Sequence, residues 1–197
     1  MTITTYLFDF DDTIIDTKIY AEIYYNVLEM IKEKLNLDDK ELEEKAKKLG
    51  FKKNKFKRWD TGDFCRELGL LDDYYMVLED KIKIMPVLHD NIVDLLTKLK
   101  EEEKQIGIVS NSMMRTIKLY LKKYELIELI DFVFSFDDAK CLKRNDNYWK
   151  TLIEKHNLEP RKCLVISDDI NDDVKMPKQF GFHTFLIKDS KDLKNLA

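Results

Sequence analysis

The sequence predicts an α/β protein whose core is a parallel, doubly wound sheet of five strands. Short β-branched or apolar runs alternate with amphipathic helical segments through the carboxyl-terminal two-thirds of the chain. This alternation is typical of parallel sheets with helices on both faces. Residues 17–85 interrupt the pattern with helical segments and no convincing strand. We therefore expect a small all-α domain inserted after the first strand.

Five runs have the length and composition of buried strands, and helical segments separate them. The strands are expected within residues 6–10, 105–112, 132–136, 162–169 and 182–187. The helices between the last four are expected at residues 114–130 and 147–158. Another precedes the second strand at residues 91–104, where four apolar residues recur at helical spacing: Ile92, Leu95, Leu96 and Leu99.

The inserted domain has three helical signals. Its first segment places four aliphatic residues on one face: Ile19, Ile23, Val27 and Ile31. Residues 38–50 contain a helix start signal and a stopping glycine, and residues 72–84 form a last segment before Pro86. These patterns predict a core domain of residues 1–16 and 86–197 and a helical domain of residues 17–85. We expect the aromatic residues of the insert to form its core: Tyr20, Tyr24, Tyr25, Trp59, Tyr74 and Tyr75.

Composition excludes several classes of partner. The 197 residues are 44% hydrophobic and 37% charged, and the formal net charge of −4 gives no general attraction for nucleic acid or an anionic membrane. Glu128 and Asp131 interrupt the most apolar run, and the amino terminus lacks a secretory signal. The three cysteines show no metal-type spacing: Cys65, Cys141 and Cys163. We expect a cytoplasmic protein with reduced thiols and neither nucleic-acid nor membrane partners.

Polar residues gather where the predicted strands end. Asp9, Asp11, Asp12 and Asp16 stand in and after the first strand. Ser110 and Asn111 follow the second strand, residues 167–173 (SDDINDD) follow the fourth, and Lys143 precedes a helix. The carboxyl ends of parallel strands meet at one edge of the sheet, where such folds bind ligands. Crowded carboxylates repel one another, which raises the pKa of at least one of them.

Together and in this order, these segments resemble the four motifs of the haloacid dehalogenase superfamily of phosphohydrolases. The segments are DFDDT, IVSNS, Lys143 six residues before Trp149, and ISDDINDD. The resemblance implies a Rossmann-like core and a helical cap domain after the first motif, as in phosphoglycolate phosphatase-like members. There are departures: Arg144 follows the motif lysine where proline is frequent, and Lys140 competes for that position. Ser167 stands where glycine is common, and Pro177 should kink or shorten an expected helix.

The resemblance also implies roles for individual residues. Asp9 would attack phosphorus and Asp11 would move protons, while Ser110 and Lys143 would bind the phosphate. A Mg²⁺ ion suits a site of hard oxygens. Its implied ligands are Asp9, Asp11 through its carbonyl and Asp168, while Asp173, or alternatively Asp169 or Asp172, would hold water bound to the metal. The substrate-contacting candidates are Asp12, Asn111 and Arg58. Two further residues are expected to be structural: Thr13 would fix the turn through its hydroxyl, and Asp16 would mark the hinge into the cap.

The predicted function is a Mg²⁺-dependent phosphomonoesterase that hydrolyses a small phosphorylated metabolite through an aspartyl-phosphate. Asp11 favours phosphoryl transfer, because halide departure needs no acid. A phosphomutase would use the same residues, and a catalytically silent binding module is an alternative of another class. A signalling receiver domain shares some residue types but lacks the helical insert. Phosphoglycolate, a sugar phosphate or a nucleotide would each fit as the substrate.

Overall fold

The computed structural model describes residues 2–54 and 56–196, and the chain divides into two compact units. The sheet unit joins the residues up to Asp16 with those from Leu88 onward, and the helical unit is Thr17–Val87. The sequence placed the second boundary two residues earlier, between residues 85 and 86. Each unit is described by itself below.

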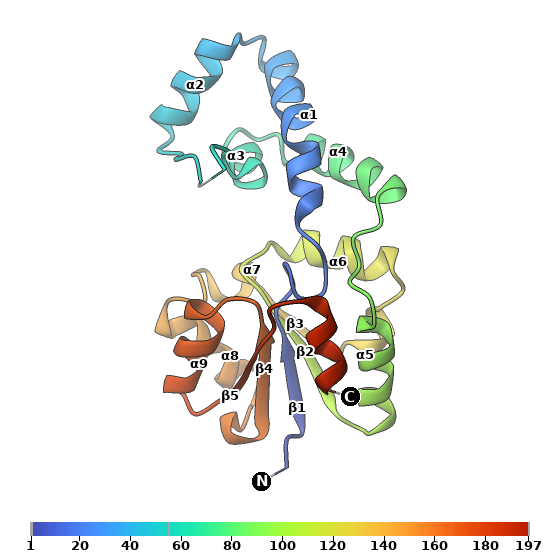
Figure 1. The fold of residues 1–197 in the computed structure, drawn as a ribbon. Coiled ribbons are helices and arrows are strands. Elements are labelled where there is room, and N and C mark those ends of the chain that lie inside the picture. The colour runs from blue at the N-terminus through green and yellow to red at the C-terminus, as the bar shows by residue number, and fades with distance from the viewer. Residues whose placement is uncertain (1, 55, 197) are drawn as a thin grey trace. The chain divides into compact units, whose positions relative to one another are not determined.

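The sheet unit is built on five parallel strands, which confirms the predicted doubly wound α/β core (Figure 1). The spatial order is β3-β2-β1-β4-β5, so the first strand lies at the centre. The chain runs outward to β3 and then crosses β1 to continue with β4 and β5. The strands are β1 (Thr5–Phe8), β2 (Gln105–Val109), β3 (Phe132–Phe134), β4 (Cys163–Ser167) and β5 (His183–Leu186).

Helices cover both faces of the sheet, as right-handed crossovers require. In Figure 1, α5 and α6 lie on one side of the strands and α8 and α9 on the other. The helices of this unit are α5 (Ile92–Glu101), α6 (Met114–Lys123), α7 (Phe136–Ala139), α8 (Asp146–His156) and α9 (Met176–Gln179). Shorter helical turns are the 3₁₀ segments Ile127–Leu129, Pro160–Lys162 and Ser190–Leu196, and a π-helical segment, Asn171–Lys175.

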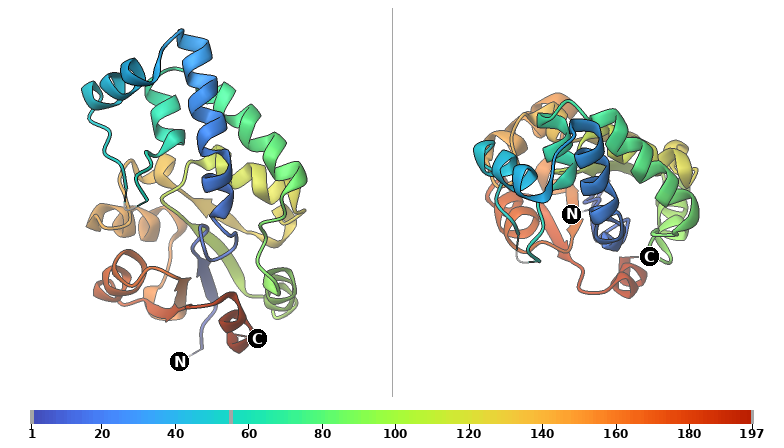
Figure 2. Two further views of the ribbon diagram at one scale, coloured as in Figure 1. Left: turned by 45° about the horizontal axis from the view of Figure 1, so that its top comes forward. Right: turned by 90° about the horizontal axis from the view of Figure 1, so that it is seen from above.

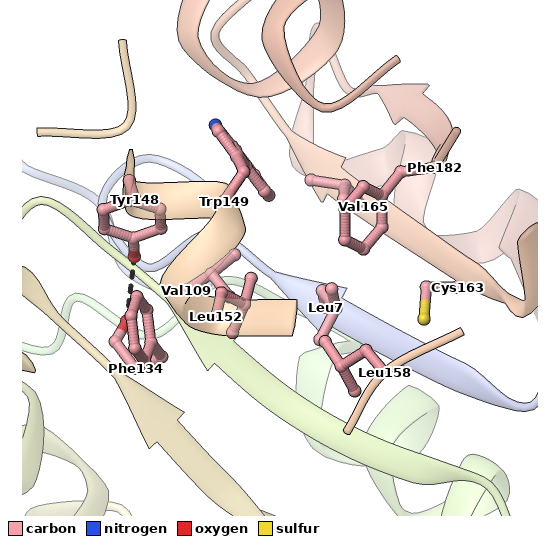
Figure 3. Close-up of a cluster of buried hydrophobic side chains, with 10 residues drawn as sticks. All are labelled: Leu7, Val109, Phe134, Tyr148, Trp149, Leu152, Leu158, Cys163, Val165 and Phe182. Carbon is pink, nitrogen blue, oxygen red and sulfur yellow. Dashed lines mark hydrogen bonds between the residues drawn. The ribbon is translucent and has the colours of Figure 1, made fainter. Parts of the chain in front are cut away.

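The face of the sheet covered by α8 is packed with buried side chains from several strands. Side chains alternate between the two faces of a strand, so Leu7, Val109 and Val165 point toward α8 and are fully buried (Figure 3). Tyr148 of α8 packs into the same cluster and donates a hydrogen bond to the Phe134 carbonyl at 2.9 Å. Ser167 follows Val165 by two residues within β4 and therefore lies on this face as well.

One helix differs from its expected range, and another is short, as the sequence predicts. The segment expected as one helix over residues 114–130 ends at Lys123, because Glu125 adopts a left-handed conformation with φ of 56°. Leu126 then donates its N–H to the Leu121 carbonyl, and a 3₁₀ turn follows. Pro177 falls at the start of α9, which has only four residues, as expected for a proline in this segment.

The helical unit contains α1 (Lys18–Leu35), α2 (Asp39–Lys48), α3 (Thr61–Glu67) and α4 (Leu71–Ile84) (Figure 2). The predicted apolar face of α1 is buried: Ile19, Ile23, Val27 and Ile31. Helix α2 begins with a capping box between Asp38 and Glu41, and Gly50 follows it with a φ of 78°. Among the described residues, no helix combines the length and the apolar character needed to cross a membrane.

Aromatic side chains fill much of the helical unit. Trp59 and Phe64 pack with ring centroids 5.6 Å apart, and the Trp59 N–H donates to the Tyr24 hydroxyl at 3.4 Å. Four of the six predicted aromatic core residues are buried: Tyr24, Trp59, Tyr74 and Tyr75. The prediction was wrong for Tyr25, which is 72% exposed, because it lies on the opposite side of α1 from the aliphatic stripe.

Candidate active site

Three buried serines stand at the carboxyl ends of three strands of the sheet and make the same local turn. Ser110 follows β2, Ser135 follows β3 and Ser167 ends β4, and all three are fully buried. Each hydroxyl oxygen accepts a hydrogen bond from the backbone N–H two residues later, which closes a turn typical of serine. The donors are Ser112 at 2.9 Å, Asp137 at 3.2 Å and Asp169 at 3.0 Å.

The three serines differ in where the hydroxyl proton goes. Ser135 donates to Asp138 Oδ2 at 3.0 Å, and Ser167 donates to Asp173 Oδ2 at 2.8 Å. Within residues 2–54 and 56–196, the Ser110 hydroxyl has no acceptor for its proton. A hydroxyl has one donor and two acceptor sites, so Ser110 differs from the other two serines in having an unused donor.

Lys143 forms the centre of a buried charge cluster at this edge. Its Nζ lies 2.5 Å from Asp9 Oδ1, 3.0 Å from Asp173 Oδ2 and 2.9 Å from Asp173 Oδ1. The side chains of Lys143, Asp9 and Asp173 are only 1%, 10% and 3% exposed. The cluster joins the end of β1, the loop before α8 and the π-helical segment after β4.

Two side chains fix the backbone of Lys143. The Asn111 side-chain oxygen accepts from the Lys143 N–H at 2.8 Å, and Trp149 Nε1 donates to the Lys143 carbonyl at 2.7 Å. Lys140, the competing candidate from the sequence, is exposed and ends α7 in a left-handed conformation. The geometry therefore places Lys143, and not Lys140, beside Asp9.

The pKa values show an excess of negative charge. Burial raises the pKa of Asp9 well above its usual value; the Lys143 charge opposes this rise, and Asp173 and Asp11 add to it. Burial would lower the pKa of Lys143, but the Asp173 and Asp9 carboxylates outweigh it and hold that pKa well above its usual value. One ammonium therefore faces at least two buried carboxylates.

The other predicted acids lie around the same edge. Asp11 Oδ2 accepts a 2.5 Å hydrogen bond from the Ser112 hydroxyl. Asp12 is exposed and left-handed, with a φ of 54°, which bends the chain after β1. Asp168 is also exposed, but surrounding protein atoms and then the charge of Asp12 raise its pKa to about 6. The Asp12 charge therefore contributes to the raised pKa of Asp168.

One structural expectation was wrong, and one predicted residue belongs to the other unit. Thr13 is fully buried, but its hydroxyl has no hydrogen-bond partner among the described residues, so it does not fix the turn as expected. The turn is instead closed by the backbone, since the N–H groups of Ile14 and Ile15 donate to the Phe10 carbonyl. Arg58 belongs to the helical unit, where its guanidinium lies over the Phe56 ring at 5.3 Å.

Some parts of the site were not expected from the sequence. The sequence marks Ser167 only as an unusual residue, predicts Asn111 as a substrate contact and indicates no role for Ser112. A detectable signal was present, because serine ends the apolar run of β2, β3 and β4 alike. Trp149 was expected near the motif lysine, but its hydrogen bond to the lysine carbonyl was not.

The described acids at this edge do not form a complete metal cage, but they could provide the few carboxylates that a Mg²⁺ ion needs. In the described part of the chain, no three histidine, cysteine, aspartate or glutamate side chains are grouped closely enough to form a metal cage. Mg²⁺ usually binds proteins through one or two carboxylates and retains several waters. The raised pKa values of Asp9 and Asp168 are consistent with such an ion.

Comparison with known proteins identifies the family. The family model for haloacid dehalogenase-like hydrolases matches residues 3–181. A Bacillus cereus protein named pyrophosphatase PpaX is 24% identical over 187 residues, covering 87% of this chain and 77% of that protein. A HAD phosphatase from Thermococcus onnurineus superimposes with a TM-score of 0.72 at 21% identity, covering 100% of this chain and 97% of that one. The HAD-hydrolase YfnB from Bacillus subtilis, solved bound to magnesium, gives a TM-score of 0.61 at 21% identity, covering 95% and 87%. The chain belongs to the haloacid dehalogenase-like hydrolase family.

Proposed function

We propose that this protein is a Mg²⁺-dependent phosphatase that hydrolyses a small phosphorylated metabolite through an aspartyl-phosphate on Asp9. One observation carries the proposal: a buried lysine, Lys143, holds the Asp9 carboxylate at 2.5 Å at the carboxyl end of β1. Burying this charge cluster costs free energy of folding. Because the cluster lies at the edge where open sheets bind ligands, we infer that its role is functional.

In the first half of the reaction, an Asp9 carboxylate oxygen attacks phosphorus. The new bond joins that oxygen to phosphorus, and the bond between phosphorus and the ester oxygen breaks. Lys143 neutralises charge shared by the nucleophile and the phosphoryl group, and Ser110 donates its free hydroxyl proton to a phosphoryl oxygen. Asp11 gives a proton to the departing alkoxide.

In the second half, water attacks the aspartyl-phosphate and Asp11 takes a proton from it. Inorganic phosphate leaves, and the Asp9 carboxylate and the protonated Asp11 are restored. The Ser112 hydroxyl, 2.5 Å from Asp11 Oδ2, would hold this carboxyl group in a defined orientation. A phosphomutase would differ only in returning the phosphoryl group to a second hydroxyl of the substrate.

The proposed Mg²⁺ ligands are the Asp9 and Asp168 carboxylates and the Asp11 carbonyl. The Asp173 carboxylate would add negative charge close to them. When bound, the ion would offset the negative charge of the acids and of the substrate phosphate. The raised pKa values of Asp9 and Asp168 support a cation here, and the related YfnB was solved bound to magnesium.

We further propose that the helical unit acts as a cap that selects the substrate and excludes water. Asp12, Asn111 and Arg58 remain the proposed substrate contacts. Phosphoglycolate, sugar phosphates and nucleotides are suitable candidates. Pyrophosphate joins them because a related Bacillus cereus protein is named a pyrophosphatase.

The test is phosphate release from p-nitrophenyl phosphate and from pyrophosphate, with and without Mg²⁺. We expect Mg²⁺-dependent turnover that Asp9→Asn lowers on the order of 10⁴-fold or more, as for other lost nucleophiles. Asp94→Asn on α5 is the matched control, because Asp94 is exposed and should leave turnover unchanged. Equal turnover in the Asp9→Asn and control proteins would rule out the proposed nucleophile.

A further inference from the structure

Ser167 is a buried polar residue to which the mechanism above gives no role. It ends β4, is fully buried, and uses its hydroxyl in two directions. The oxygen accepts from the Asp169 N–H at 3.0 Å, and the proton is donated to Asp173 Oδ2 at 2.8 Å. Asp169 Oδ1 in turn accepts from the N–H groups of Asn171 and Asp172, so the hydroxyl is tied to the turn that carries Asp173.

The Asp173 oxygen bound by Ser167 is also bound by Lys143. Lys143 Nζ donates to Asp173 Oδ2 at 3.0 Å and to Asp9 Oδ1 at 2.5 Å. The contacts therefore form a continuous buried chain from the end of β4, through Ser167, Asp173 and Lys143, to Asp9 at the end of β1. Since the terminal torsion of aspartate is broad, Asp173 alone would not have a fixed orientation.

We propose that Ser167 is a positioning residue that orients Asp173 and thereby holds the Lys143 ammonium on Asp9. This inference rests on the proposed function for its catalytic consequence, but its structural part concerns Lys143 alone. The hydroxyl fixes the rotation of the Asp173 carboxylate so that Oδ1 and Oδ2 lie 2.9 and 3.0 Å from Nζ. Ser135 makes the same turn after β3, which β2 and β1 separate from β4, but donates to Asp138, away from this cluster.

The catalytic test compares Ser167→Ala with Ser135→Ala. Each substitution removes one buried hydroxyl and one turn hydrogen bond, so both should lower the thermal midpoint to a similar extent. Supporting groups around an active centre are typically worth about 10–100-fold in activity, and we expect a loss of this size in kcat/KM for Ser167→Ala only. Equal kcat/KM values in the two variants would overturn the proposal.

A second readout does not depend on turnover. The ammonium protons of Lys143 are buried and hydrogen-bonded, so their ¹⁵N–¹H signal should exchange slowly and can be assigned by its loss in Lys143→Met. We expect Ser135→Ala to retain this signal, and Ser167→Ala to shift it and speed its exchange. An unchanged signal in Ser167→Ala would overturn the positioning role. If the wild type released no phosphate from any substrate, the proposed function would fail, and this measurement would still decide the inference.

Discussion

The sheet unit and the helical unit bury different kinds of side chain. The sheet unit buries a full charge cluster: Asp9, Lys143 and Asp173. Among the described residues of the helical unit, Thr61 is the buried polar side chain and no charged one is buried. The ion pairs of the helical unit lie at its surface; Lys34 and Asp73, for example, are 2.6 Å apart but 53% and 23% exposed.

The two kinds of ion pair have similar distances but different surroundings, and this difference decides their energies. Exposed pairs contribute little because water and salt screen them. Buried pairs depend on one another, since removal of one partner leaves a charge without compensation. Replacing a whole buried pair by apolar residues is often neutral or stabilising, so stability does not explain why the sheet unit contains one. This contrast is why we assign chemistry to the sheet unit.

The strongest test of this contrast applies one substitution to both units. Lys143→Met leaves Asp9 and Asp173 buried without a cation, and should lower the free energy of unfolding by about 3–5 kcal/mol. Lys34→Met removes an exposed pair and should cost about 0–1 kcal/mol. Urea unfolding of the sheet unit is followed by the fluorescence of Trp149 in a Trp59→Phe background. Unfolding of the helical unit is followed by the fluorescence of Trp59 in a Trp149→Phe background. Similar losses in both units would contradict the distinction.

Apolar packing should, by contrast, matter equally in both units. Leu152 of α8 and Leu78 of α4 are both fully buried. Leu152→Ala and Leu78→Ala should each lower the free energy of unfolding by about 2–5 kcal/mol, through lost burial and the cavity left behind. The same two fluorescence backgrounds measure the losses. A negligible loss at Leu78 would mean that the helical unit is only loosely packed.

The sequence predicted these apolar features well because they depend on periodicity. The five strands, their parallel arrangement and the buried face of α1 all follow from local patterns of apolar residues, whereas the strand order was not predicted. The position of Asp9 at a strand end was also predictable, whereas Lys143 was assigned through the family resemblance, with Lys140 as a competitor. The sequence could not show that Asp173 contacts Lys143, because this contact depends on the π-helical segment between residues 171 and 175.

The predictions that were wrong concern side chains whose surroundings depend on tertiary packing. The Thr13 hydroxyl has no partner although threonine commonly stabilises turns, because the backbone around Phe10 already closes the turn. Tyr25 is exposed although its neighbour Tyr24 is buried, since successive residues of a helix point in different directions. No local pattern distinguishes these cases before the neighbouring elements are placed.

Two glycine substitutions, one in each unit, test crowding at Gly107 and backbone strain at Gly69. A Cβ on Gly107 of β2 would lie 2.4 to 2.9 Å from the Phe132 ring, which is stacked on His156 at 3.9 Å. Gly107→Ala should therefore cost about 1–3 kcal/mol by overpacking, and Phe132→Leu should recover part of that loss. Gly69 has open space around it but a φ of 71°, so Gly69→Ala should cost about 1–2 kcal/mol through backbone strain. Urea midpoints of the single and double variants measure both. No recovery in the double variant would contradict crowding as the cause.

The smallest expected difference concerns the two capping boxes, Ser135–Asp138 of α7 and Asp38–Glu41 of α2. Burial would raise the pKa of Asp138, but hydrogen bonds from Lys155 and Ser135 outweigh it and hold that pKa below its usual value. A lowered pKa means that the carboxylate stabilises the fold above its unfolded-state pKa of about 3.9, and that this contribution is lost as the pH falls through the folded-state pKa.

Asp138→Asn should therefore cost about 0.5–1 kcal/mol at neutral pH, because it removes the pair with the half-exposed Lys155. Asp38→Asn should change little, because asparagine caps helices as well as aspartate does. Unfolding midpoints between about pH 7 and about pH 3 check the sign: the Asp138→Asn difference should shrink on acidification, and a constant difference would show that the carboxylate charge is not what stabilises this turn.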